Sequence, residues 1–149
     1  MQRSSEYGKL LRNKQLLKRA YLLSERQFER LVMEISAKYS KNKAVSRDVA
    51  LYQFLERRID VTLLRAGFAK TIMQARQMVN HGHITLNSKK HNIPSTFENV
   101  GDILSIKPKL QKSSLYSQIF SENTKIKIPS WLKVNKNNYS IEVLNLPQI

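Results

Sequence analysis

The chain has 149 residues, which is enough for one domain or two small ones, each with a modest core. It carries 26 Lys and Arg but 11 Asp and Glu, and the resulting formal net charge of +15 indicates a polyanionic partner or an acidic surface. The absence of cysteine excludes disulfides and thiol chemistry. No apolar run approaches the roughly 20 residues of a membrane-spanning helix, so we expect no membrane association.

The first part of the chain is predicted to be helical, with apolar positions at Leu10, Leu11 and Leu17. Ser24 and Gln27 have the spacing of a capping box, in which each side chain accepts a hydrogen bond from the other residue's backbone N–H. The apolar stripe of the helix that they begin consists of Phe28, Leu31, Val32 and Ile35. Ser46 can cap a further helix, whose apolar positions are Val49, Tyr52 and Leu55.

Two more helices are predicted next. Asp60 is expected to be the N-cap of a short helix that ends at Gly67, a residue that tolerates a left-handed turn. Thr71 and Gln74 have the capping-box spacing at the start of the second helix, which ends at Gly82. Its buried face is predicted to contain Ile72, Ala75 and Val79, with Met78 at the border and with Gln74, Arg76, Gln77 and Asn80 on the opposite side.

The following segment is predicted to be mainly extended. Residues 83–87 alternate between polar and apolar as in a half-buried strand, and the turn Ser88-Lys89-Lys90 should raise two ammonium groups into solvent. A further strand is expected over 103–106. Residues 110–123 favour one more helix, with Leu115, Ile119 and Phe120 on its apolar side, and the chain after Lys125 returns to extended structure around Pro129.

The stretch between Asp60 and Glu98 contains no acidic residue. It contains five cationic residues and three histidines, namely Arg65, Lys70, Arg76, Lys89, Lys90, His81, His83 and His91. Basic tails are commonly disordered, but this stretch has the caps and turns of a folded unit. The pattern therefore predicts an ordered surface that binds RNA.

Several single residues have more than one possible role. Histidine is a common zinc ligand, but His81 and His83 flank a glycine that ends a helix and have no cysteine or carboxylate beside them, so we expect no metal site. Phe68 could stack on a base, although core packing is the more usual role of a Phe after a helix end. Trp131 is interpreted as a packing anchor between the C-terminal segment and the helices. No phosphate-binding loop, nucleophile elbow or carboxylate pair suggests an enzyme or a cofactor.

Three separated groups of residues carry a resemblance to a known family. The first is Tyr7-Gly8, Leu11-Arg12 and Glu25-Arg26-Gln27-Phe28; the second is Arg58-Ile59-Asp60, Leu64-Arg65-Ala66-Gly67-Phe68 and residues 75–84; the third is Pro129-Ser130-Trp131-Leu132. With these groups in this order, nearly the whole chain resembles the S-four family of small-subunit ribosomal proteins. The chain departs from the family in lacking a longer N-terminal segment before Tyr7-Gly8, in a shortened C-terminal strand region, and in having Asn87-Ser88 where the family commonly has Asn-Gly.

The resemblance implies an α+β fold. A helical domain of residues 1–54 and about 124–149 would carry an inserted S-four-type RNA-binding module at 55–123, with two short helices on a small, mainly antiparallel sheet. The residues assigned to RNA contact are Arg58, Arg65, Lys70, Thr71, Gln74, Arg76, Gln77, Asn80, His81, Lys89 and Lys90 in the module, with Tyr7, Arg12, Lys14 and Arg26 before it.

The function that the resemblance implies is that of a structural, non-enzymatic constituent of the small ribosomal subunit. Such a protein binds a junction in the five-prime domain of small-subunit ribosomal RNA, supports assembly and influences translational accuracy. Its expected partners are that RNA and neighbouring small-subunit proteins, S-five among them, and no homo-oligomer is expected. The alternative is a free-standing RNA-binding factor of the heat-shock or ribosome-rescue type. The residues around Ala69–His81 resemble plastid versions, so a plastid ribosome is the expected location and a mitochondrial ribosome the alternative.

Overall fold

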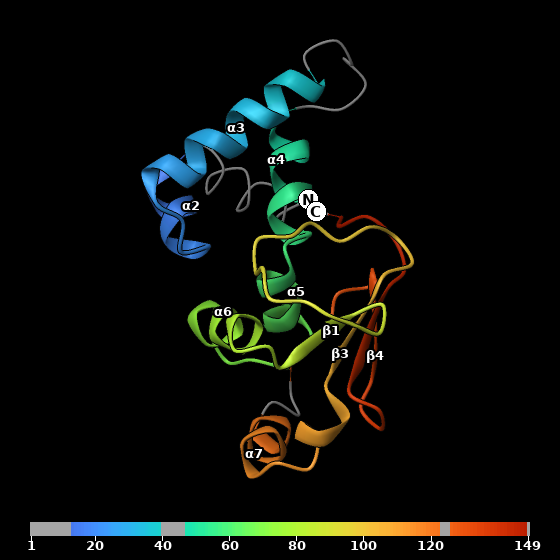
Figure 1. The fold of residues 1–149 in the computed structure, drawn as a ribbon. Coiled ribbons are helices and arrows are strands. Elements are labelled where there is room, and N and C mark those ends of the chain that lie inside the picture. Colours follow the sequence, from blue (N-terminus) through green and yellow to red (C-terminus); the bar gives the residue numbers. More distant parts are fainter. Residues whose placement is uncertain (1–12, 40–46, 123–125, 149) are drawn as a thin grey trace. The chain divides into compact units, whose positions relative to one another are not determined.

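The computed structural model describes residues 13–39, 47–122 and 126–148 (Figure 1). Two compact units make up the chain: one runs to Glu56 and takes in the last residues from Pro147, and the other is Arg57–Leu146. The side chains of Tyr52 and Gln53 bond the backbone carbonyls of Gln148 and Pro147, so the chain returns to the first unit at its end. Within the described residues, no helix is long and apolar enough to cross a membrane.

The first unit contains three described helices, α2 (Lys14–Ala20), α3 (Glu25–Tyr39) and α4 (Arg47–Glu56). Its buried apolar side chains include Leu17, Tyr21, Phe28, Leu31, Ile35, Leu51, Phe54 and Leu55. The predicted stripe on α3 is therefore confirmed except at Val32, which is 36% exposed. The Tyr21 hydroxyl donates to the Glu56 carboxylate at 2.6 Å, and both residues are buried, so this polar contact has its hydrogen bond inside the core.

The capping box at the start of α3 forms in both directions. The backbone N–H of Gln27 donates to the Ser24 hydroxyl at 3.1 Å, and the N–H of Ser24 donates to the Gln27 side-chain oxygen at 2.9 Å. Two backbone donors that the helix itself cannot satisfy are thereby paired. The predicted cap at Ser46, like the apolar positions Leu10 and Leu11, lies outside the described residues.

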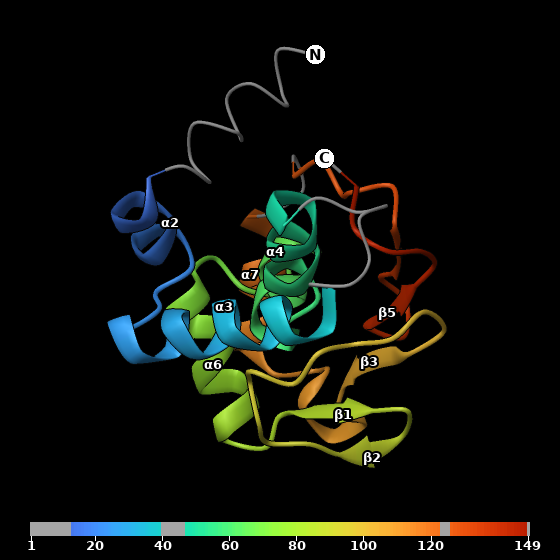
Figure 2. The same ribbon diagram turned by 90° about the horizontal axis from the view of Figure 1, so that it is seen from above.

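The second unit is α+β, as expected. Its helices are α5 (Ile59–Arg65), α6 (Ile72–Asn80) and α7 (Ser114–Glu122), with a short 3-10 helix at Pro108–Leu110. Its strands are β1 (Ile84–Leu86), β2 (Lys89–Lys90), β3 (Ile103–Ile106), β4 (Leu132–Asn135) and β5 (Ser140–Val143). They form one sheet in the order β2-β1-β3-β5-β4, and every neighbouring pair is antiparallel. Figure 2 shows the β1–β2 hairpin at one side of β3 and β5 at the other.

The core of the second unit lies between the helices and one face of the sheet. The alternation of strand side chains places Leu104 and Ile106 of β3 and Ile141 and Val143 of β5 in this core. Phe68 joins them, with no exposed surface and its ring edge-on to Phe120 at 4.8 Å. Core packing is therefore the role of Phe68, and base stacking is excluded in this conformation.

The C-terminal segment differs from its predicted place. Residues from about 124 onward were expected to join the helical domain, but Leu104 of β3 pairs with Ile141 of β5, and Val134 of β4 pairs with Ile141 on its other side. The sheet would otherwise end at β3, with the edge of that strand open. The half-buried Trp131 consequently packs against the core of the second unit.

Helices α5 and α7 also differ from the predictions made from the sequence. Asp60 is not the N-cap of α5, which begins two residues earlier, at Ile59, with Arg58 in the capping position and without a side-chain cap. Along α7, the buried residues are Tyr116 and Ile119, whereas Leu115 is 45% exposed. Ile119 and the half-buried Phe120 therefore face the core as predicted, whereas Tyr116 is buried instead of Leu115, with its hydroxyl 2.8 Å from the His83 Nδ1.

Candidate nucleic-acid interface

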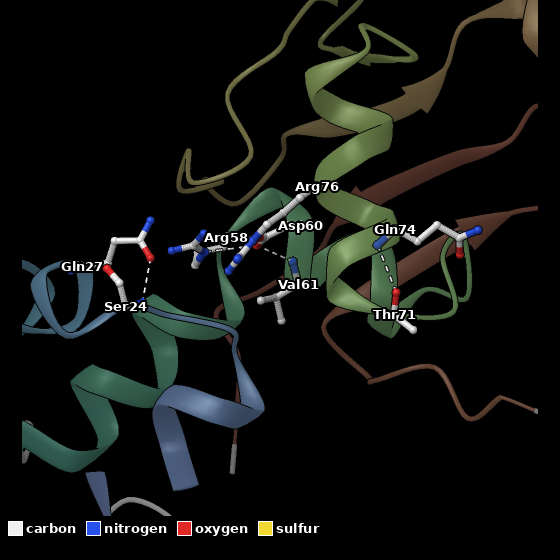
Figure 3. Close-up of polar contacts among 8 residues, drawn as sticks. All are labelled: Ser24, Gln27, Arg58, Asp60, Val61, Thr71, Gln74 and Arg76. Carbon is white, nitrogen blue, oxygen red and sulfur yellow. Dashed lines mark hydrogen bonds and ion pairs between the residues drawn. The ribbon is translucent and has the colours of Figure 1, made fainter. Parts of the chain in front are cut away.

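Local turns fix the orientation of α6. Gly67 has φ +80°, in the left-handed region, and lets the chain leave α5 sharply. The N–H of Gln74 then donates to the Thr71 hydroxyl at 3.0 Å, as the capping box predicts (Figure 3). The side-chain oxygen of Gln74 accepts from the N–H of Lys70 at 2.7 Å, so the reciprocal bond reaches one residue beyond its predicted partner. Thr71 and Gln74 are thus engaged in starting the helix.

The two faces of α6 separate as predicted. Ile72, Ala75, Met78 and Val79 are buried, and Met78 lies in the core rather than at its border. On the other side Gln77, Asn80 and His81 are exposed. Short polar side chains along one helix face can contact phosphate and sugar groups of a nucleic acid without disturbing the core.

Asp60 forms an ion cluster with two arginines that had been assigned to RNA contact (Figure 3). Arg58 donates to its carboxylate through Nε and an Nη at 3.1 and 3.0 Å, and Arg76 donates through Nε at 2.8 Å. The Val61 N–H is a further donor at 2.7 Å. Arg58 is buried, and the side chain of Arg76 is 19% exposed. A buried carboxylate needs compensating charge, which both arginines supply, and the Arg76 bond also joins α6 to α5.

The β1–β2 hairpin presents two lysines. Asn87 and Ser88 have φ of +53° and +69°, so both adopt the left-handed conformation of a tight two-residue turn although neither is glycine. The side-chain oxygen of Asn87 accepts from the N–H of Ile103 at 2.9 Å, which helps to hold the turn. Lys89 and Lys90 lie in β2 rather than in the turn, and both are exposed.

Burial of acidic side chains makes this surface more basic than the sequence alone shows. Asp60 and Glu98, which bracket the stretch without acidic residues, are 0% and 1% exposed. From residue 57 to residue 101, therefore, no carboxylate reaches the surface. Lys70, Lys89 and Lys90 are exposed, and Arg65 is half-buried. A surface of one charge sign raises the local concentration of a polyanion and speeds its association.

His83 and His91 each contact the hydroxyl group of another residue. The His83 Nδ1 lies 2.8 Å from the Tyr116 hydroxyl, and the His91 Nε2 lies 2.7 Å from the Thr96 hydroxyl. Burial, followed by the neighbouring His81 and Lys107, lowers the pKa of His83. Burial raises the pKa of Tyr116 to about 12, so the phenol keeps its proton. Among the described residues, no group of three or more His, Cys, Asp and Glu is placed to hold a metal ion.

Some predicted contact residues stand outside the module. Tyr7 and Arg12 lie outside the described residues, whereas Lys14 and Arg26 are exposed at the starts of α2 and α3. Lys107 was missed by the sequence reasoning. Its backbone N–H bonds the His83 carbonyl at 2.9 Å, so the register of β1 and β3 brings it beside α6. No local motif marks that proximity.

Models of known protein families match residues in both compact units. The family model described as "Ribosomal protein S4/S9 N-terminal domain" matches residues 1–56, and the one described as "S4 domain" matches residues 57–104. The boundary between the two matches coincides with the boundary between the compact units. Two family models thus match successive parts of the chain.

Individual proteins of this family are similar to the chain over nearly all of its length. The "Small ribosomal subunit protein uS4" of Thermoanaerobacter sp. (strain X514) is 40% identical over 144 residues, which are 97% of this chain and 66% of that protein. The proteins of the same name from Chlorobium phaeovibrioides and Aquifex aeolicus are 37% and 39% identical over 97% of this chain, and the matches cover 68% and 66% of their lengths. The chain spans about two thirds of the length of the curated relatives it matches. It belongs to the uS4 family of small ribosomal subunit proteins.

Proposed function

We propose that this protein is a structural, non-enzymatic constituent of the small ribosomal subunit that binds small-subunit ribosomal RNA. Membership of the uS4 family supports the assignment to that subunit. The observation that carries RNA binding is the surface between residues 57 and 101, which exposes Lys70, Lys89 and Lys90 while its two acidic side chains are buried. Neutralisation of phosphates by such cations supplies much of the affinity of nucleic-acid complexes.

The RNA target proposed is a folded junction in the five-prime domain of small-subunit ribosomal RNA. The exposed face of α6 and the β1–β2 hairpin present short polar side chains and ammonium groups, which suit contacts with the backbone of a folded RNA more than the reading of base edges. Holding such a junction would support assembly of the subunit and influence translational accuracy. S-five is the neighbouring protein proposed, and a plastid ribosome is the proposed location, with a mitochondrial ribosome as the alternative.

The first test is direct binding by the full chain. Affinity for a transcript of the small-subunit five-prime domain should exceed affinity for a large-subunit RNA of equal length, and it should fall steeply with added salt. Equal affinity for the two RNAs would refute the junction as the target.

The second test is retention on ribosomes. A tagged full chain should sediment with small subunits and stay there through a high-salt wash. Recovery mainly on large subunits would favour the free-standing rescue-type factor instead. Comparing plastid and mitochondrial fractions of a source cell would test the location separately from the RNA.

A further inference from the structure

Two ammonium groups converge above Gly82, at the end of α6. Gly82 is buried and has φ +74°; the position that its missing Cβ would take lies 3.7 Å from the Lys90 Nζ and 3.8 Å from the Lys107 Nζ. The two lysines come from different parts of the sheet. Thr85 of β1 pairs with Lys90, and the Lys107 N–H bonds the His83 carbonyl, so β1 holds both of them beside the same turn.

The surroundings of this pair are cationic. Lys107 has a lowered pKa, through desolvation first and then through the charges of Lys90 and Lys109. Within the parts of the chain that the structure describes, neither Lys90 nor Lys107 forms an ion pair with a carboxylate. Like charges so close repel one another, and a bound anion would relieve that repulsion.

We propose that Lys90 and Lys107 form a phosphate-binding site over Gly82, which holds one backbone phosphate of the RNA partner. The proposal rests on the proposed function of the same surface. A lysine ammonium is a compact charge with three donors that suits a single phosphate. Because glycine has no Cβ, a phosphate oxygen can approach the backbone between the two ammonium groups, where a side chain would come within 3.1 Å of the Lys90 Cε.

The dipole of α6 offers an alternative explanation for the position of these lysines. Cations are favoured beyond the C-terminus of a helix by its dipole, and both lysines lie there. Three carbonyls in the last turn of α6 already have partners, however. Those of Gln77, Met78 and Val79 accept from the N–H groups of His81, His83 and Gly82. The lysines are therefore not needed to satisfy these carbonyls, and the two explanations differ in whether removing the lysines changes stability or affinity.

His83 supplies an independent readout. The groups known to face it are His81 at the end of α6, Lys107 after β3 and Tyr116 of α7. Lys107 helps to hold its pKa down. A phosphate that neutralises Lys107 removes this influence, so the pKa of His83 should rise on RNA binding. The bound state then takes up protons, and the affinity should increase as pH falls through the range between the free and bound pKa values.

The experiment uses the full chain with five-prime-domain RNA over a range of salt concentrations. The double variant Lys90→Gln, Lys107→Gln should lose about tenfold in affinity. Its slope of log affinity against log salt should fall in magnitude by roughly 0.7 to 0.9, the value for one phosphate contact. The matched control is Lys133→Gln in β4, an exposed lysine on the opposite edge strand, which should stay within about twofold of wild type.

The outcomes distinguish failure of the phosphate site from failure of the proposed RNA-binding function. A wild-type chain that does not bind the RNA overturns both the proposed function and this site. If the wild-type chain binds and the double variant keeps the same affinity and salt slope, the site alone is overturned. Lowered stability of that variant would then show that the lysines interact with the helix dipole. A His83 pKa that rises on RNA binding, followed by NMR of its ring protons, supports the site; an unchanged value overturns it.

Discussion

Replacing Glu98 by glutamine should stabilise the second unit increasingly as pH rises from about 5 to about 8. The side chain is 1% exposed, and neither carboxyl oxygen has a hydrogen-bond partner within ordinary geometric limits. Burial raises its pKa from 4.5 to about 8; Thr62 and Arg57 oppose this shift, and Asp102 adds to it. At neutral pH the folded protein therefore holds this carboxyl in its protonated form.

The sign and size follow from proton linkage. Between pH 4.5 and about 8 the folded state binds this proton and the unfolded state releases it, so the free energy of unfolding decreases as pH rises. Each pH unit costs up to about 1.4 kcal/mol, which makes the cost about 3 kcal/mol at pH 7. Glutamine has nearly the same shape and no charge. Part of the gain should be offset, because its amide is desolvated too, leaving about 2 kcal/mol.

Urea denaturation of wild type and Glu98→Gln at pH 5, 6, 7 and 8 checks this. The chain has one tryptophan, Trp131, and it packs in the second unit, so its fluorescence follows the unfolding of that unit. The two variants should be nearly equal in stability at pH 5 and diverge toward pH 8. Glu142→Gln, at a half-exposed position in β5, is the control and should show no such divergence. A difference between Glu98→Gln and wild type that does not change with pH would refute the reasoning.

Three further predictions concern the faces of the module. Val79→Asp should unfold the second unit because it buries an unpaired carboxylate, whereas Gln77→Ala should leave stability within about 0.5 kcal/mol of wild type; the reverse order of denaturation midpoints would mean that the orientation of α6 is wrong. Arg76→Gln should cost about 1 to 3 kcal/mol through its lost bond to Asp60, yet change the salt slope of RNA binding little; a large change in slope with unchanged stability would contradict the ion-cluster role. The isolated unit Arg57–Leu146 should fold but bind five-prime-domain RNA more weakly than the full chain, and equal affinities would show that the first unit adds nothing to binding.

The features that the sequence could predict are those governed by neighbours along the chain. The caps at Ser24 and Thr71 and the helix ends at Gly67 and Gly82 depend on backbone groups within a few residues, and the structure confirms them. The buried face of α6 follows in the same way from helical spacing. The left-handed turn at Asn87-Ser88 is different, because its conformation did not follow from the sequence and Asn87 is held by a bond from Ile103, sixteen positions later.

The features that could not be predicted depend on contacts between distant residues. Asp60 could equally well have capped a helix, and only the approach of Arg76, sixteen positions later, shows that it forms an ion cluster instead. The pairing of β5 with β3 joins residues nearly forty positions apart. The convergence of Lys90 and Lys107 has the same origin, since two strand pairings must form before the lysines meet. No pattern within a short window carries that information.

The net charge of the chain does not show which cationic side chains are available to contact RNA. The fold decides this, because it engages some of them in ion pairs and leaves others exposed. Arg58 and Arg76, whose guanidinium groups could make bidentate contacts, are bound to the buried Asp60. Lys89 and Lys90 remain exposed on β2, where they act as point charges. A surface of exposed lysines with buried carboxylates attracts any phosphate backbone and distinguishes targets through shape more than through bases. RNA binding should accordingly respond more strongly to salt, and to substitutions that unfold the target junction, than to base changes that preserve its folded shape.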